Sequence, residues 1–267
     1  MSEKLPLSVS IITFNEEENL PRALESIKDI ASEIIVVDSH STDRTREIAK
    51  EYGAKVFEED WKGHMAQKNS ALQKCTQPWI LSLDADEEVS PELKEEIIKR
   101  IKNPDADGYY VNRKTYHLGK FLNHVWQPDW KLRLVKRSAN PHWGGYDPHD
   151  KLIIDGKTKK IKRGYLYHYS YKDLYDQFSR LVKYAKVGAE SYHRFGKNFS
   201  LWHLVVNPTY AFVKEFFIKR GFLDGLVGFE VSVTHAFYVF MKYMFLWEIE
   251  KNEKKKAEVS NRDTSAK

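Results

Sequence analysis

The sequence has a single cysteine, Cys75, among its 267 residues. One thiol cannot form an intramolecular disulfide, so a reducing compartment is expected. The uncharged stretch 231–241 is far shorter than the roughly 20 residues that a transmembrane helix needs. The N-terminus leads straight into a strand pattern, which predicts that there is no signal peptide. Together these absences favour a cytoplasmic protein.

Glycine is missing where a dinucleotide-binding domain would need it. The turn after the first predicted strand, 14–17, contains no glycine, which argues against an ordinary NAD-binding Rossmann domain. The basic residues are dispersed and form no recognisable nucleic-acid-binding module, so a nucleic acid partner is not expected. The net charge of +5 and the pI of about 8.9 favour an anionic partner without identifying it.

Apolar runs alternate with helical patterns in the N-terminal part of the chain. Three runs rich in apolar residues, 7–13, 33–37 and 79–83, predict strands, and the β-branched residues of the first two suggest burial on both faces. Apolar residues recur at helical spacing between and after them, and Ser90-Pro91 is typical of a helix start. At this length the chain can form one α/β core with an appended module. The pattern therefore predicts an α/β fold.

Polar side chains follow all three predicted strands. They are Thr13 to Glu16 after the first, Asp38 after the second and Asp84-Ala85-Asp86 after the third. Ligands of open α/β sheets bind outside the carboxyl ends of the strands, so these groups are expected to converge. Two carboxylates one residue apart can hold a hard divalent cation against a diphosphate. The alternative is that both are solvated loop residues.

Eight segments carry a resemblance to a known family. Segments 10–17, 35–39, 67–72 and 83–87 occur together and in order. This set resembles glycosyltransferase family 2, which implies the GT-A fold, a Rossmann-like mixed sheet flanked by helices. Segments 131–134, 149–152, 167–171 and 221–225 are similar to the bacterial lipopolysaccharide core glycosyltransferases that add a β-linked glucose to inner-core heptose. The resemblance covers roughly residues 5 to 247.

By this resemblance a UDP-sugar binds at the convergent polar groups. The implied nucleotide-sugar contacts are Thr13, Phe14, Glu16, Asp38, Lys68, Asp84 and Asp86. Phe14 would stack under the uracil ring, although it could instead cap the core. Asp84 would face the ribose, and Asp86 would coordinate Mg²⁺ or Mn²⁺. Related enzymes use a late histidine as another metal ligand, here His168, for which a packed core residue is the alternative.

Four other charged residues have a functional and a structural interpretation. Asp38 ends a hydrophobic strand and needs a donor partner, for which uracil or ribose is the candidate. Lys68 would reach the nucleotide pocket by the resemblance, or else be a surface charge. Lys131 and Arg133 could contact a phosphorylated or carboxylated acceptor, and ordinary surface charges are the alternative.

Transfer with inversion also requires a base near the acceptor hydroxyl. The family commonly has His-Glu where this chain has His149-Asp150, so the resemblance implies Asp150, whose side chain is one methylene shorter. Asp147 is the second candidate. The structural alternative is a polar turn, with Asp155-Gly156 forming the following hairpin.

Aromatic and aliphatic residues crowd together with basic ones between 201 and 247. Such helices suit an interfacial position against anionic lipid, with Trp202 and Trp247 at headgroup depth. Burial against the catalytic domain or in a dimer is the equal alternative. The predicted domains are a GT-A catalytic domain at 1–195, an amphipathic helical region at 196–250 and a disordered polar tail at 251–267.

The residues and the resemblance together predict a metal-dependent inverting glycosyltransferase, peripheral on the inner face of the cytoplasmic membrane. It would move a hexose, most simply glucose, from a UDP-sugar to a lipid-linked saccharide such as the lipopolysaccharide inner core. Two alternatives stay open: transfer to another lipid-linked or protein-linked glycan, and a noncatalytic nucleotide-sugar-binding scaffold. Intact Asp84, Asp86 and Asp150 argue against the scaffold.

Overall fold

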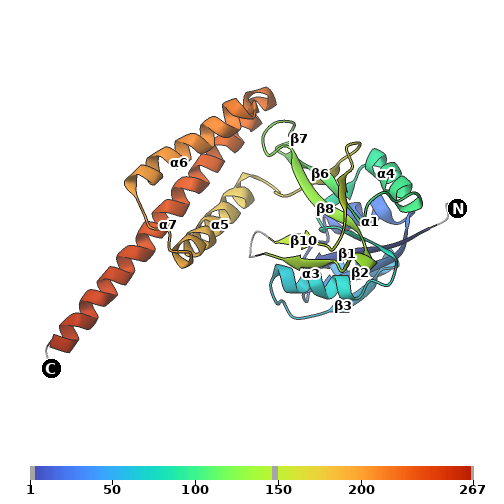
Figure 1. The fold of residues 1–267 in the computed structure, drawn as a ribbon, viewed down its shortest axis with the longest axis horizontal. Helices are drawn as coiled ribbons and strands as arrows, with labels where there is room; N and C mark the ends of the chain where they lie inside the picture. The colour runs from blue at the N-terminus through green and yellow to red at the C-terminus, as the bar shows by residue number, and fades with distance from the viewer. Residues whose placement is uncertain (1–3, 146–149, 266–267) are drawn as a thin grey trace. The chain divides into compact units, whose positions relative to one another are not determined.

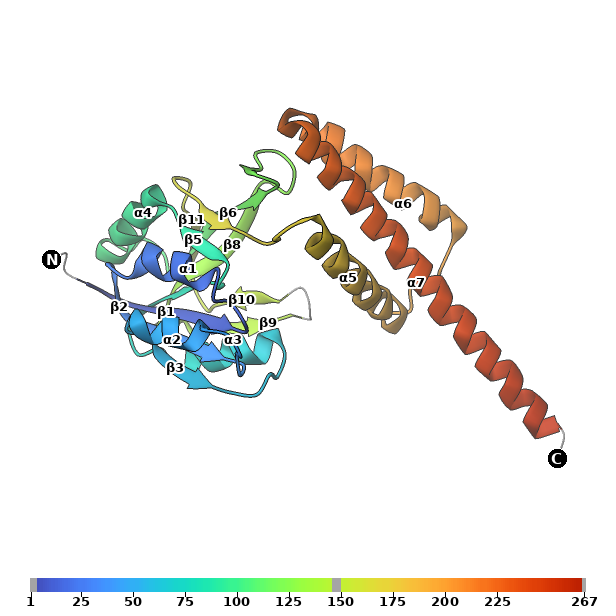
Figure 2. The same cartoon turned by 180° about the vertical axis from the view of Figure 1, so that it is seen from behind.

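The structure, a computed structural model, describes residues 4–145 and 150–265. They form two compact units, which Figures 1 and 2 show from opposite sides. The sheet unit comprises the chain up to Tyr116 together with Pro128–Ser170. The helical unit comprises His117–Gln127 together with the chain from Tyr171 onward.

One mixed sheet organises the sheet unit. Its main strands are β1 (Leu5–Thr13), β2 (Ala31–Asp38), β3 (Lys55–Glu58), β4 (Trp79–Ser82), β5 (Glu87–Val89), β6 (Gly108–His117), β8 (Asp129–Lys136) and β12 (Leu166–His168). They follow the order β3-β2-β1-β4-β8-β6-β12-β5. The first four in this order are parallel, whereas β8 is antiparallel to both β4 and β6. β11 (Thr158–Lys160) pairs with β6, and β9 (His142–Gly144) with β10 (Lys151–Ile153) in a separate ribbon.

Helices cover both faces of this sheet. They are α1 (Leu20–Ile27), α2 (Thr45–Glu51), α3 (His64–Gln73) and α4 (Pro91–Lys102), with a 3-10 turn η1 (Arg137–Ala139). The buried faces of α1, α2 and α4 pack with Ile34 and Val36 of β2 in one apolar cluster. Ala71 and Leu72 of α3 pack with Ile35 and Val37 in the other. Because side chains alternate along a strand, the two clusters lie on opposite faces of the sheet.

The helix starts and burial patterns agree with the sequence. Ser90 caps α4 by accepting a hydrogen bond from the backbone N–H of Leu93 at 3.2 Å, ahead of Pro91 at the first helical position. The helical spacing of apolar residues in α1 and α4 places them in the core; these are Leu20, Ala23, Leu24, Ile27, Leu93, Ile97 and Ile101. The predicted mixed sheet flanked by helices is confirmed.

Three helices make up most of the helical unit: α5 (Leu174–Arg194), α6 (Leu201–Val213) and α7 (Gly225–Ser265). A π-helical turn η2 (Lys214–Ile218) and a 3-10 turn η3 (Gly221–Asp224) join α6 to α7, and β7 (Lys120–Phe121) lies in the segment inserted from the sheet unit. Both α5 and α6 lie along α7, as Figures 1 and 2 show. The predicted helical C-terminal region is present. Among the described residues, no helix has the length and apolar character for crossing a membrane.

The turn before α7 is fixed by one buried carboxylate. Asp224 is 1% exposed and accepts backbone hydrogen bonds from Asn123, His124 and Val125 at 2.9 to 3.0 Å. Glycine is required beside it, because a Cβ on Gly228 would lie 1.9 Å from the carbonyl oxygen of Gly221. The similarity of segment 221–225 to related enzymes therefore has a structural explanation within this unit.

The structure differs from the sequence prediction in three places. Helix α5 groups with the helical unit, although the predicted catalytic domain extended to residue 195. Helix α7 continues to Ser265, through most of the tail 251–267 that we expected to be disordered, because lysine, glutamate and alanine are good helix formers. The hairpin at Asp155-Gly156, which belonged to the structural alternative for Asp150, does not form, since β10 pairs with β9 and β11 pairs with β6.

Candidate active site

The loops after β1 and β2 are bonded to each other at the carboxyl edge of the sheet. Asn15 has a positive φ of 55°, and its backbone N–H donates to the Ser41 hydroxyl at 2.8 Å. Its side-chain oxygen accepts from the backbone N–H of Thr42 at 2.8 Å, and the backbone N–H of Glu16 donates to Thr45. Asparagine tolerates this left-handed conformation better than most residues. The two loops therefore form one ordered rim.

Phe14 projects from this rim. Its side chain is 57% exposed, so the structure does not support the alternative in which it caps the core. Glu16 lies on the same loop and accepts a hydrogen bond from Asn19 at 3.0 Å. The exposure of Phe14 leaves its ring available to a ligand, and the contacts of Phe14 and Glu16 with a nucleotide stay predictions.

Asp38 is fully buried, and the protein itself supplies its donor partners. Thr13 donates to Asp38 Oδ1 at 2.8 Å, and Ser41 donates through both its backbone N–H and its hydroxyl. The burial of this carboxylate therefore does not require a nucleotide, contrary to our reason for selecting it. Strand alternation also directs Asp38 to the same face as Val36, the face that α1, α2 and α4 cover.

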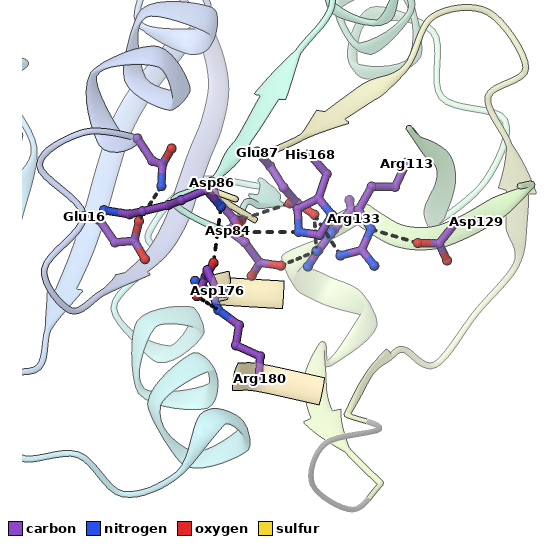
Figure 3. A network of polar contacts seen from close by, with 12 residues as sticks. Glu16, Asp84, Asp86, Glu87, Arg113, Asp129, Arg133, His168, Asp176 and Arg180 are labelled. Atoms are coloured by element: carbon purple, nitrogen blue, oxygen red, sulfur yellow. Dashed lines mark hydrogen bonds and ion pairs between the residues drawn. The ribbon is translucent and has the colours of Figure 1, made fainter. Parts of the chain in front are cut away.

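Asp84 and Glu87 flank the turn between β4 and β5 and are joined by Arg133 of β8 (Figure 3). The Arg133 Nη2 atom lies 2.6 Å from Asp84 Oδ2 and 2.7 Å from Glu87 Oε1. Arg113 of β6 extends the network, because its guanidinium lies 3.5 Å from Glu87 and 2.8 Å from Asp129. Neither residue had a role assigned from the sequence: Glu87 lies in the motif segment 83–87 without an assigned function, and no motif marks Arg113.

This network sets the charge of Asp84. Burial alone would raise the pKa of Asp84, but the charge of Arg133, followed by Lys68 and Arg113, lowers that pKa well below its usual value. Burial would lower the pKa of Arg133, and Asp84 and Glu87 raise it instead. Asp84 is thus held as a carboxylate at any physiological pH.

Arg133 is only 2% exposed, which contradicts the prediction of a surface contact with an acidic acceptor. Its strand lies between β4 and β6, with both faces covered, so the guanidinium turns to internal carboxylates. Lys131, two residues earlier, has a side chain that is 39% exposed and pairs with Asp129 at 3.1 Å. A contact between Lys131 and an acceptor stays a prediction.

Lys68 brings the predicted base to the acidic turn. Its Nζ atom lies 3.2 Å from Asp84 Oδ1 and 3.2 Å from Asp150 Oδ2, and 4.2 Å from the ring centroid of Trp143. Its side chain is 13% exposed, so it is not an ordinary surface charge. Asp150 is part-buried, and Asp147, the second candidate for the base, lies outside the described residues.

Asp86 and His168, the two predicted metal ligands, also lie together. Asp86 Oδ2 is 3.3 Å from His168 Nε2, and the strand β12 that carries His168 pairs with β5 next to the acidic turn (Figure 3). Residues 4–145 and 150–265 contain no group of three or more histidine, cysteine, aspartate or glutamate side chains arranged to hold a metal ion. A single carboxylate such as Asp86 nevertheless fits Mg²⁺, which commonly takes one or two carboxylates and completes its shell with phosphates and water, whereas the imidazole of His168 suits Mn²⁺.

Buried polar atoms without partners collect around this region. Within the described part of the sheet unit, they include Ser39 Oγ, both polar atoms of the Gln67 side chain, Trp143 Nε1 and His168 Nδ1. Native proteins pair most buried polar atoms with protein or water, so such a concentration indicates a place where a ligand or water binds. Ser39 and Gln67 lie in the motif segments 35–39 and 67–72, where neither residue had an assigned role.

Known proteins share both the sequence and the fold. The family model described as Glycosyl transferase family 2 matches residues 8–161. The chain is 33% identical over 257 residues to an uncharacterized glycosyltransferase of Rickettsia typhi, an alignment that covers 91% of this chain and 87% of the relative. It is 30% identical over 248 residues to the lipopolysaccharide core biosynthesis glycosyltransferase LpsC of Rhizobium meliloti, with 90% and 92% covered.

Two solved structures illustrate the fold. The mannosyltransferase PcManGT from Pyrobaculum calidifontis, in complex with GDP-Man and Mn²⁺, has a TM-score of 0.53 at 13% identity and covers 92% of this chain and 88% of its own. The TarS 1–349 fragment from S. aureus, in complex with UDP-GlcNAc, has a TM-score of 0.51 at 14% identity and covers 94% and 92%. These likenesses confirm the predicted GT-A fold.

Proposed function

We propose that this chain, which belongs to glycosyltransferase family 2, transfers a hexose from a UDP-sugar to a lipid-linked saccharide with inversion at the anomeric carbon. One observation carries the proposal: Lys68 Nζ lies 3.2 Å from both Asp84 and Asp150. This contact brings the Asp150 carboxylate next to the acidic turn, which supports a base for the acceptor beside the donor site. A scaffold would not need that arrangement.

In the proposed reaction, Asp150 acts as general base. The acceptor hydroxyl oxygen attacks the anomeric carbon, its proton passes to Asp150, and the bond from that carbon to the diphosphate oxygen breaks. Lys68, which lies over the Trp143 ring, positions Asp150, while Arg133 and Glu87 hold Asp84 in place. Preorganised charges of this kind avoid reorganisation during the reaction.

The residues Asp86 and His168 would hold a divalent cation beside the diphosphate. When bound, Mg²⁺ or Mn²⁺ supplies positive charge that stabilises the leaving nucleoside diphosphate. His168 is a nitrogen ligand, which suits Mn²⁺ better than Mg²⁺.

The helical unit supports a lipid-linked acceptor. Around the turn between α6 and α7, large apolar side chains are exposed: Phe217, Ile218, Phe222, Leu223 and Leu226. Lys214 and Arg220 are exposed in the same turn, and Trp202 is 70% exposed. Apolar side chains flanked by cations suit the interface of an anionic membrane. The relative named for lipopolysaccharide core biosynthesis points to the same class of acceptor.

The test is a screen of UDP-sugars for hydrolysis or transfer, with Mg²⁺, with Mn²⁺ and with chelator. Membrane extracts that contain truncated lipopolysaccharide serve as acceptor, and extracts without lipopolysaccharide serve as the control. We expect cation-dependent transfer of one hexose, with glucose as the first candidate. A chain that binds no UDP-sugar, or that transfers equally to both extracts, would refute the donor or the acceptor assignment respectively.

A further inference from the structure

Gln67 is fully buried in the first half of α3, yet its side chain has no hydrogen-bond partner among the described residues. Its exposed fraction is 0%, and neither Oε1 nor Nε2 is paired. Leaving a buried polar group unpaired costs about 1 to 3 kcal/mol, so a glutamine here needs an explanation. A methionine or leucine of similar size would avoid that cost.

The topology places Gln67 at the carboxyl edge of the sheet. Helix α3 connects β3 to β4, which run in the same direction, so it starts at the edge where β3 ends. Its neighbours verify this position: Lys68 contacts Asp84, and the Asn69 side chain exchanges two hydrogen bonds with the backbone of Trp143. Of the side chains of these three consecutive polar residues, only that of Gln67 has no protein partner in the described structure.

Ser39 belongs to the same place. Along β2, Ile35 and Val37 face α3 and pack in the cluster that contains Ala71, so alternation directs Ser39 to the α3 side as well. Gln67 lies one helical turn before Ala71, toward the carboxyl edge. Ser39 is 7% exposed, and its hydroxyl also lacks a partner among the described residues. Two unpaired polar side chains therefore lie at the same end of the layer between β2 and α3.

The chemistry of these groups identifies what they can bind. A carboxamide offers one acceptor and two donors, and a hydroxyl offers both functions. A diphosphate presents only acceptors and would leave Gln67 Oε1 facing an anion. A nucleobase edge presents a donor next to an acceptor, which a carboxamide can match with two hydrogen bonds. Ser39 follows β2, which lies on the far side of β1 from β4 and from the acidic turn after it.

We propose that Gln67, assisted by Ser39, binds the edge of the donor nucleobase and thereby selects the nucleotide. This inference rests on the proposed function, because it assumes that a nucleotide-sugar occupies the carboxyl edge. The fold leaves the base open, since the similar PcManGT and TarS structures hold GDP-Man and UDP-GlcNAc respectively. Selection must then come from side chains such as these.

The experiment measures UDP binding calorimetrically, in the presence of Mn²⁺, for the full chain and three variants. In Gln67→Met the size is kept and the polar atoms are removed, and Ser39→Ala removes the hydroxyl. Gln177→Met is the matched control, because Gln177 is also buried with an unpaired Oε1 but lies in α5 of the helical unit. We expect about tenfold weaker UDP binding for Gln67→Met, a smaller loss for Ser39→Ala and none for Gln177→Met.

Two further readouts separate ligand contact from a structural role. The melting temperature of ligand-free Gln67→Met should equal or exceed that of the wild type, because an unpaired group has been removed. UDP methylated at N3 should bind the wild type more weakly than UDP, and this difference should shrink in Gln67→Met because the contact is gone.

Each outcome decides one question. A wild type with no UDP affinity refutes the proposed function. A wild type that binds UDP, with a folded Gln67→Met that binds it equally well, refutes the role of Gln67. If Gln67→Met does not fold, the UDP affinity of Ser39→Ala tests the inference instead. Unchanged UDP affinity in Ser39→Ala overturns the inference.

Discussion

Replacing Arg133 by methionine tests whether this side chain supports the buried carboxylates Asp84 and Glu87 or contacts an acceptor at the surface. The guanidinium is the shared partner of Asp84 and Glu87, at 2.6 and 2.7 Å, and the side chains of Arg133 and Glu87 are 3% and 0% exposed. Removing one partner of a buried ion pair costs about 3 to 5 kcal/mol, because a charge stays buried without compensation. Lys68 and Arg113 remain near the two carboxylates, so we expect the lower end, about 3 kcal/mol.

For a unit of this size, that loss corresponds to a melting temperature lower by about 6 to 12 °C, which circular dichroism measures. Lys131→Met is the matched control on the same strand, where an exposed pair is worth about 0 to 1 kcal/mol. The double variant Glu87→Gln with Arg133→Met should recover part of the loss, since one buried charge is removed. A melting temperature of Arg133→Met within about 2 °C of the wild type would be far smaller than the expected shift. If the acceptor KM alone rises in that variant, the interpretation of Arg133 as a buried support is wrong.

Four other variants test the remaining parts. Asp86→Ala should abolish cation-dependent turnover while the melting temperature stays near that of the wild type, and normal turnover would remove the metal assignment. Asp150→Asn should retain UDP binding but lower transfer at least a hundredfold, of the order expected for loss of a general base; unchanged transfer would direct attention to Asp147. Hydrogen bonds from Ser8, Thr76 and Lys55 outweigh burial and lower the pKa of Glu33 from 4.5 to about 2. Because this pKa is depressed in the folded state, the stabilisation of about 3 kcal/mol is present above pH 4.5 and is lost as pH falls toward 2; urea unfolding of Glu33→Gln should show a flatter pH dependence there, and an equal slope would refute it. Leu226→Glu should weaken flotation with anionic vesicles, and unchanged flotation would exclude this turn as the contact.

The sheet and its first helices were predictable because local signals and tertiary packing agree there. The β-branched runs of β1 and β2 are buried on both faces, and the helical spacing in α4 coincides with its buried face and with the Ser90 cap. The convergence of strand-end residues followed from the parallel arrangement alone. Thr13 and Asp38, at the ends of β1 and β2, are joined by a hydrogen bond of 2.8 Å. The contacts of Lys68 with Asp84 and Asp150 did not follow from that arrangement, because Lys68 and Asp150 were selected through the resemblance.

The antiparallel half of the sheet carried no comparable signal. In β8, Leu132 and Leu134 alternate with Lys131 and Arg133, a pattern typical of a strand with one solvated face. The strand is interior instead, so burial of Arg133 depends on carboxylates that come from β5 and the turn before it. Such long-range pairing is invisible to local periodicity.

Residue type alone did not predict the roles of Asp38 and Gln67, because these roles depend on the hydrogen bonds that each side chain makes or lacks. Asp38 was selected because a buried carboxylate needs donors, and Thr13 and Ser41 supply them. Gln67 resembled a neutral helix residue, and only the lack of a partner within the described structure distinguishes it. Sequence patterns indicate which polar groups are buried, but only the three-dimensional structure shows whether each of those groups has a hydrogen-bond partner.

Calorimetric titration of UDP, with and without Mn²⁺, into the wild type and Asp86→Ala bears on the whole proposal. We expect UDP to bind the wild type, Mn²⁺ to tighten that binding at least about tenfold, and the Asp86→Ala variant to lose the gain. No detectable affinity of the wild type for UDP in the presence of Mn²⁺ would contradict the assignment of this sheet edge as a nucleotide-sugar site.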